Sequence, residues 1–236
     1  MVLYRQKGVI MIGIMCAMEK EQDAVISRMK NVKESSIKGM QIHTGTLSNT
    51  EVVVCLAGIG KVEAAISTTL LLDAMKIDKV INVGVAGSVS KELKVFDIIV
   101  ADRIAQWDLD MLEDESTRNY DKSITSCVCD VHMNQVILNH MEGKRVFLKS
   151  IVTGDQFVYM DSQRETIHHY FPEATCCDME AGAIAKACKR QNVPVCILRS
   201  ISDSSESEDN SVDYTTFVMK ACEVIGECME AVADQL

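Results

Sequence analysis

Short apolar runs alternate along the chain with segments whose apolar residues recur every three or four positions. The short runs, bounded by glycine or polar residues, are typical of buried strands, and the longer spacing is typical of amphipathic helices. Strands are predicted at residues 9–17, 79–88, 95–108, 145–155, 175–180 and 193–203, with a hairpin at 40–58. Helices are predicted at residues 18–29, within 58–76, at 130–141 and 161–170, from 181 to about 191, and from 212.

The alternation of strands with helices predicts an α/β fold with a mixed, largely parallel central sheet flanked by helices. A length of 236 residues suits one such domain. No repeat, linker or low-complexity tract interrupts the pattern. We therefore expect a single domain over residues 11–236, preceded by an N-terminal extension at residues 1–10.

Charge and hydropathy exclude two classes of partner. The net charge is −10, and no cluster of Lys and Arg offers the basic face that a nucleic-acid-binding protein needs. The apolar start of the chain lacks a small-residue cleavage site, and no apolar run is long enough to cross a membrane. We expect neither nucleic acid nor a membrane as a partner.

The 10 cysteines lie mostly inside apolar runs, where free cysteine packs as a small apolar residue. A chain of this size does not need disulfides for its core, so a reducing, cytoplasmic compartment is expected. The pairs Cys127/Cys129 and Cys176/Cys177 lack the CxxC spacing of a zinc site, and no second pair completes one. We expect no bound metal.

Carboxylates gather where the predicted strands end. Glu21, Asp155, Asp178, Glu180 and Asp203 each follow a strand. Each acid taken alone could cap the next helix. Ligands bind outside the carboxyl ends of the strands in open α/β sheets. Several acids at one edge therefore favour acid–base chemistry on a neutral or cationic group.

Seven segments carry a family resemblance in their order and spacing. They read IGIMCAMEKE, AGIGKVEAA, NVGVAGS, LKVFDIIVAD, TGDQFV, CDMEAGAIA and VPVCILRSISD. From about residue 11 onward the chain resembles the 5'-methylthioadenosine/S-adenosylhomocysteine nucleosidases of the nucleoside phosphorylase superfamily. The resemblance implies a nucleoside phosphorylase-like fold, a homodimer that needs no cofactor, and hydrolysis of a nucleoside to adenine and a 5-thioribose.

The resemblance also implies catalytic roles for three of the carboxylates. The N-glycosidic bond breaks through a cation-like sugar, as in other glycoside hydrolyses. Asp203 would protonate adenine at N7, and Glu21 would activate the attacking water. Glu180 would hold the ribose hydroxyls, and its charge would favour the sugar cation.

Further residues are expected around the substrate by the same resemblance. Phe157 would stack on adenine, and the backbone of Val158 would read the edge of the base. Met179 would line the ribose pocket. Met18 and Ile59 would form an apolar wall, although burial in the core is an alternative for both.

Three polar residues are expected to support the catalytic acids. Ser202 would orient Asp203. Arg199 would be a partner of Glu180, with a salt bridge at the edge of the core as the alternative. Asp178 is expected to cap the following helix or support the site from behind, with a weaker contact to the substrate left open.

Two departures from the family leave the preferred 5' substituent open. Val85 stands where the family usually has a serine, and residues 106–129 lack the family's glycines and prolines. A phosphorylase, a futalosine-type hydrolase or a non-catalytic nucleoside-binding protein remain alternatives. Phosphorolysis is disfavoured because Glu19 and Glu21 would repel phosphate where related phosphorylases carry arginine.

Overall fold

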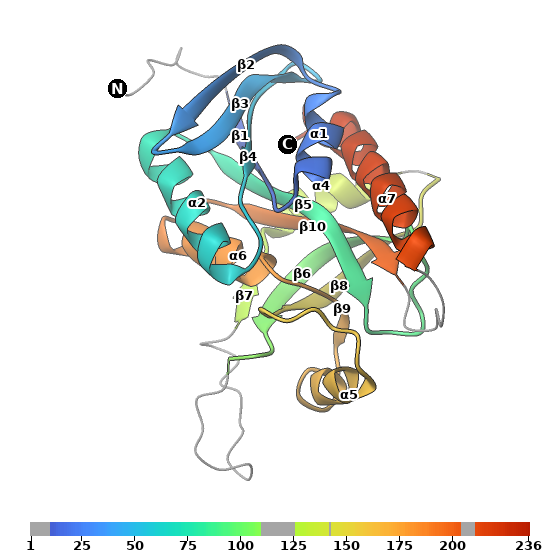
Figure 1. Ribbon diagram of the computed structural model, residues 1–236. Coiled ribbons are helices and arrows are strands. Elements are labelled where there is room, and N and C mark those ends of the chain that lie inside the picture. Colours follow the sequence, from blue (N-terminus) through green and yellow to red (C-terminus); the bar gives the residue numbers. More distant parts are fainter. Residues whose placement is uncertain (1–9, 110–125, 142, 204–210) are drawn as a thin grey trace.

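The computed structural model describes residues 10–109, 126–141, 143–203 and 211–236 (Figure 1). Its strands are β1 (Met11–Cys16), β2 (Lys30–Ile37), β3 (Met40–Leu47), β4 (Thr50–Leu56), β5 (Lys79–Ser88), β6 (Ile98–Gln106), β7 (Ser126–Val128), β8 (Val146–Thr153), β9 (Ala174–Asp178) and β10 (Val195–Asp203). Its helices are α1 (Glu19–Ile26), α2 (Lys61–Ala74), α4 (Val131–Asn139), α5 (Asp161–Tyr170), α6 (Ala181–Arg190) and α7 (Ser211–Val232).

The strands form one mixed sheet, so the predicted α/β class is confirmed. Four adjacent strands run parallel to one another, in the order β4, β1, β5 and β10. From β10 the sheet continues through β6, β8 and β9, and β9 pairs back onto β5. This part of the sheet therefore closes on itself, while β3 and β2 extend it as an open, antiparallel edge beyond β4 (Figure 1).

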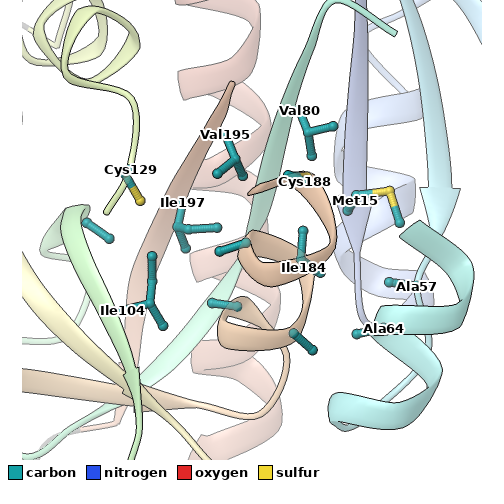
Figure 2. Close-up of a cluster of buried hydrophobic side chains, with 14 of the residues drawn as sticks. Met15, Ala57, Ala64, Val80, Ile104, Cys129, Ile184, Cys188, Val195 and Ile197 are labelled. Carbon is teal, nitrogen blue, oxygen red and sulfur yellow. The ribbon is translucent and has the colours of Figure 1, made fainter. Parts of the chain in front are cut away.

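Helices cover both faces of the sheet. In Figure 1, α2 and α6 lie together on one side and α1 and α7 on the other. Side chains of a strand alternate between faces, and β1 follows this rule. Ile12 and Ile14 join the core cluster that α7 covers. Met15 joins the opposite cluster, which packs around Ile184 and Cys188 of α6 (Figure 2).

Sequence patterns missed two strands. The segment KNVKESSI, which forms β2, is exposed at nearly every position and carries no apolar alternation. Among the described strands it pairs with β3 alone, so its polar composition suits a solvated sheet edge. Strand β7 is only 3 residues long and pairs with β6.

Some predicted boundaries were too wide. The first helix ends at Ile26 and not at residue 29, because β2 begins at Lys30. The strand predicted from residue 95 begins at Ile98, because Phe96 has a φ of 72°, which interrupts an extended strand. The hairpin predicted at 40–58 is confirmed by the antiparallel pairing of β3 with β4, and its turn has positive φ at Ser48 and Asn49.

All of the cysteines are free and buried, as expected from their apolar surroundings. Within the described ranges, no group of three or more His, Cys, Asp or Glu is arranged to hold a metal ion. No helix in the described part of the chain has both the length and the hydropathy to cross a membrane. Residues 1–9 of the predicted extension at 1–10, and residues 110–125 of the divergent segment at 106–129, lie outside the described residues.

Candidate active site

A cavity of about 210 Å³ lies where β1, β5, β9 and β10 end. Residues of the loops after β4 and β8 complete its wall. The predicted site residues that line it are Met18, Glu21, Ile59, Val85, Phe157, Val158, Met179, Glu180, Ser202 and Asp203. The structure thus brings together every predicted site residue except Arg199, which lies beneath the cavity.

Glu21 is buried in the first turn of α1, where backbone groups hold both of its carboxylate oxygens. The N–H groups of Ala17 and Met18 donate to Oε2 at 2.9 and 3.0 Å, and that of Val85 donates to Oε1 at 2.9 Å. A Cβ at Gly84 would lie 2.5 Å from Oε1, so only glycine allows this approach. Glu21 therefore caps its helix and also faces the cavity.

The pKa of Glu21 reflects this surrounding. Burial raises it above its ordinary value, and the positive charge of Arg199 and the three N–H donors oppose the rise. The carboxylate is held in one orientation while it keeps a greater affinity for a proton than a carboxylate in water.

Asp203 and its neighbour Ser202 both line the cavity, although adjacent strand residues normally face opposite sides. An irregularity in the pairing of β10 with β5, between Ile201 and Asp203, explains this arrangement. Ser202 Oγ donates to Asp203 Oδ1 at 2.8 Å. Burial raises the pKa of Asp203, and the bond from Ser202 opposes the rise.

Glu180 faces the cavity from the start of α6 without capping that helix. Its Oε1 accepts the Gly60 N–H at 2.9 Å, from the loop before α2. Burial, followed by the negative charge of Asp178, raises the pKa of Glu180 to about 7.

Asp178 performs the capping that Glu180 does not. Its Oδ2 accepts the N–H of Ala181 at 3.1 Å, and its Oδ1 accepts the hydroxyl of Thr153 at 2.5 Å. The two acids on either side of Met179 therefore have different tasks. Asp178 ties the end of β9 to α6 and β8, which leaves Glu180 free for the cavity.

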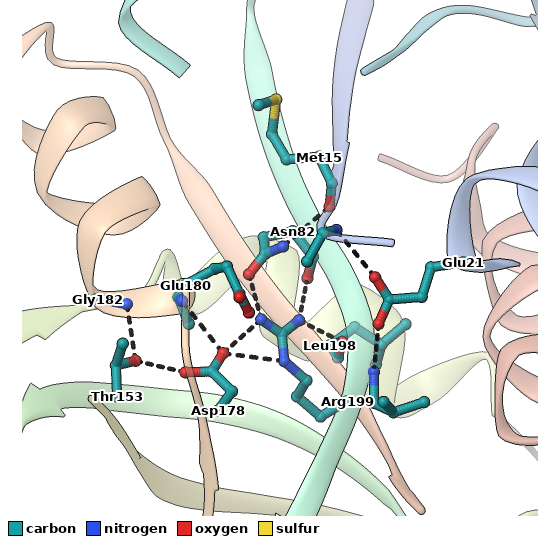
Figure 3. Close-up of polar contacts among 12 residues, drawn as sticks. Met15, Glu21, Asn82, Thr153, Asp178, Glu180, Gly182, Leu198 and Arg199 are labelled. Atoms are coloured by element: carbon teal, nitrogen blue, oxygen red, sulfur yellow. Dashed lines mark hydrogen bonds and ion pairs between the residues drawn. The ribbon is translucent and has the colours of Figure 1, made fainter. Parts of the chain in front are cut away.

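Arg199 forms a salt bridge, which was the alternative to a partnership with Glu180, but it lies in the core and not at its edge. The partner is Asp178: Nε donates to Asp178 Oδ2 at 3.1 Å, and Nη2 approaches the same oxygen at 2.5 Å (Figure 3). Nη1 donates to the carbonyl oxygens of Asn82 and Leu198, and Nη2 also bonds the Asn82 side chain. This fully buried network joins β5, β9 and β10 beneath the cavity.

Exposure locates the mouth of the cavity. The side chains of Ile59 and Phe157 are 63% and 55% exposed, so burial in the core, the alternative considered for Ile59, is wrong. Met18 is half-buried at the same wall. Asp155, the remaining acid at a strand end, lies outside the cavity lining and bonds the backbone of Lys61.

Sequence reasoning missed several contributors. Asn82 is a buried polar residue inside an apolar strand, and that contrast was a usable signal. Thr153 donates to Asp178 and accepts the Gly182 N–H at 2.9 Å, which its sequence alone did not indicate. The Gly60 N–H left no trace beyond a glycine in a turn, because a backbone donor has no side-chain signature.

Comparisons with known proteins agree with the geometry. The sequence pattern of the Phosphorylase superfamily matches residues 11–235. A 5'-methylthioadenosine/S-adenosylhomocysteine nucleosidase of Staphylococcus aureus (strain bovine RF122 / ET3-1) is 35% identical over 231 residues, covering 96% of this chain and 100% of that protein.

Two solved structures are similar along nearly the whole chain. The nucleosidase of the same name from Neisseria meningitidis, in complex with methylthio-immucillin-A, gives a TM-score of 0.85 at 27% identity, covering 97% of this chain and 100% of that one. Futalosine hydrolase of Helicobacter pylori strain 26695 gives 0.86 at 28% identity, covering 98% and 100%.

Proposed function

Because the chain belongs to the phosphorylase superfamily, and within it to the 5'-methylthioadenosine/S-adenosylhomocysteine nucleosidases, we propose that it hydrolyses the N-glycosidic bond of one or both of these nucleosides. The products are adenine and a 5-thioribose. The observation that carries the proposal is the convergence of Glu21, Glu180 and Asp203 on one cavity.

Asp203 acts as the general acid. Adenine leaves more readily when its N7 is protonated as the glycosidic bond breaks. A carboxyl with a raised pKa, held by Ser202 at 2.8 Å, is suited to give up a proton to the base. Phe157 and Val158, from the loop after β8, line the same cavity and hold the base by stacking and by backbone contact.

Glu21 and Glu180 act on the sugar. Bond breaking leaves positive charge on the ribose ring, which nearby carboxylates stabilise. Glu180 accepts hydrogen bonds from the ribose hydroxyls, with Met179 against the ring. Glu21 accepts the proton of the water that attacks the opposite face, and its N–H donors fix the carboxylate that does so.

Water is the nucleophile in preference to phosphate. A phosphorylase must hold a dianion beside the sugar, which calls for arginine or a dense set of donors. The residues that line the described cavity include neither Lys nor Arg, and Glu21 would repel phosphate. Arg103 lies within β6 and lines a different cavity with Asp102 and Val128.

Futalosine hydrolysis is the second candidate function, because the futalosine hydrolase structure is as similar to this chain as the nucleosidase structure is. We expect adenine release from methylthioadenosine or S-adenosylhomocysteine at rates far above adenine release from adenosine or hypoxanthine release from futalosine. A protein that binds adenine by calorimetry but releases no base from any of the four nucleosides would contradict the proposal and favour a non-catalytic binding protein.

Three further expectations belong to the proposal. The active form is a homodimer, supported by exposed apolar side chains along one side of α2 beside the cavity mouth, Val62 at 67% and Ile66 at 50%. The location is cytoplasmic, and residues 11–236 form the nucleosidase domain after an extension at 1–10. Sedimentation that finds an active monomer at assay concentrations would contradict the dimer.

A further inference from the structure

A closed polar cluster lies beside the cavity and has no part in the reaction as described so far. It consists of Lys61 at the start of α2, Asp108 after β6 and Asp155 after β8. Lys61 Nζ donates to Asp108 Oδ1 at 2.6 Å, and the Asp155 N–H donates to Asp108 Oδ2 at 2.7 Å. The Lys61 N–H completes the cycle by donating to Asp155 Oδ1 at 2.7 Å. We call these three residues the clasp.

The clasp is better built than an ordinary surface ion pair. The side chain of Lys61 is 18% exposed and that of Asp108 is 10% exposed, so water screens their attraction only in part. Both oxygens of Asp108 are bonded, and Lys61 Nζ also lies 3.7 Å from Asp155 Oδ2. Gly60 fits closely against it: a Cβ there would lie 3.1 Å from Asp155 Oδ1.

The clasp joins two parts of the cavity that are far apart in sequence. Gly60, whose N–H donates to Glu180, directly precedes Lys61. Gln156 and Phe157, which line the cavity, directly follow Asp155. The hydrogen bond from the Lys61 N–H to the Asp155 carboxylate spans 94 positions, so hydrogen bonds and not chain connectivity fix the separation of these loops.

We propose that Lys61, Asp108 and Asp155 are positioning residues of the reaction, which hold the ribose-binding Glu180 and the base-stacking Phe157 loop at a fixed relative position. The inference rests on the proposed function, since it assigns the clasp to that same site. Misplacing a reacting group by about 1 Å can cost on the order of 100-fold in rate, so even a small drift of either loop would slow turnover.

The clasp also affects the charge of Glu180. The Gly60 N–H and Arg199 favour the ionised carboxylate, whereas burial and the negative charges of Asp178 and Glu21 disfavour it. If the loop before α2 drifts, Glu180 loses a donor and its pKa rises further above its ordinary value. The acidic limb of the activity profile should then move to higher pH.

The test compares Lys61→Met with Lys144→Met. Lys144 Nζ bonds Glu227 Oε2 at the same 2.6 Å but joins the turn before β8 to α7, where neither residue lines the cavity. We expect Lys61→Met to lower kcat/KM at least about tenfold and to move the acidic limb upward. Lys144→Met should keep the wild-type kcat/KM and the wild-type acidic limb of the pH–activity profile. Lys61→Arg should have a kcat/KM between those of Lys61→Met and the wild type.

Two outcomes would overturn the inference: a Lys61→Met variant with wild-type kcat/KM and pH profile, or a loss of activity that Lys144→Met matches. Failure of the proposed function is recognised separately, because the wild type would then release no adenine. In that case calorimetry with adenine judges the clasp alone. Weaker binding by Lys61→Met than by Lys144→Met supports it, and equal binding overturns it.

Discussion

The two sides of the cavity hold their carboxylates in different ways. On one side, backbone N–H groups fix Glu21 and Glu180, and the positive charge of Arg199 lies behind both. On the other side, Asp203 receives one hydrogen bond from a side chain, the hydroxyl of Ser202. Burial raises the pKa on both sides, so the difference lies in what opposes the rise.

This difference separates the acid from the bases. Fixed N–H donors and a buried cation offset part of the pKa rise that burial causes in Glu21 and Glu180. The ionised form, which can accept a proton from water and stabilise a sugar cation, therefore stays accessible. Burial raises the pKa of Asp203 against one hydroxyl donor and the positive charge of Arg164, so Asp203 can carry the proton that the leaving base needs. Pairs of titratable groups whose environments differ in this way commonly divide acid and base roles.

Replacing the acid should have the largest effect. We expect Asp203→Asn to slow adenine release by about 10³-fold or more, because asparagine has no proton to give, while affinity for the substrate stays near wild type. Single-turnover kinetics with calorimetric binding would separate the two quantities. Turnover within a few-fold of wild type would refute the assignment of the acid.

Replacing the base should have the next largest effect. We expect Glu21→Gln to slow turnover by about 10²-fold, because glutamine can accept the backbone N–H bonds but cannot take a proton from water. The roles of Glu21 and Asp203 are separated if adenine release falls in this variant while the part of the pH–activity profile that Asp203 causes stays unchanged. Loss of substrate binding without loss of kcat would contradict the role of base.

Glu180→Gln should stabilise the folded protein above about pH 7. The pKa of Glu180 rises from an ordinary 4.5 to about 7 in the folded protein, so folding favours the protonated form. The wild-type free energy of unfolding therefore falls as pH rises between these values, and the loss is complete above about pH 7. Glutamine does not ionise, so the variant should be more stable by roughly 2 kcal/mol at pH 8.

Denaturant unfolding at two pH values checks this expectation. At pH 5 the variant and the wild type should differ little, because most of the wild-type Glu180 is then protonated in the folded state. A Glu180→Gln variant that is less stable than the wild type at pH 8 would mean that the carboxylate is not the buried, disfavoured charge described above.

Val85→Ser should have the smallest effect. Val85 contributes its N–H to Glu21 and lines the cavity, and a serine would add a hydroxyl near the water or ribose while keeping the N–H bond. We expect kcat/KM to rise by a few-fold at most, within about 1 kcal/mol. A marked fall in activity would show that the apolar side chain of Val85 itself supports the catalytic carboxylates.

The site could be located from sequence because its side chains follow strand ends. An α/β pattern places such residues at one edge, so Glu21, Glu180 and Asp203 could be grouped before any coordinates. Their roles came from family resemblance and not from the pattern. The hairpin turn at Ser48 and Asn49 was equally readable, because turn residues carry local signals.

What could not be predicted depends on contacts between distant segments. The pairing of Arg199 with Asp178, and the Gly60 donor for Glu180, depend on packing that no periodicity encodes. The closure of β9 onto β5 rests on pairing at only two positions, Gly87 with Cys177 and Ser88 with Cys176. Strand β2 was missed because an exposed edge strand needs no apolar alternation.

The sugar product tests the central claim most directly. Methylthioadenosine is incubated with the wild type in ¹⁸O-labelled water, with and without millimolar phosphate, and the products are identified by mass. If Glu21 activates water, a free 5-thioribose carrying one labelled oxygen appears with adenine at a rate that phosphate does not change. A sugar 1-phosphate that forms only when phosphate is present would contradict both the hydrolysis and the role of Glu21.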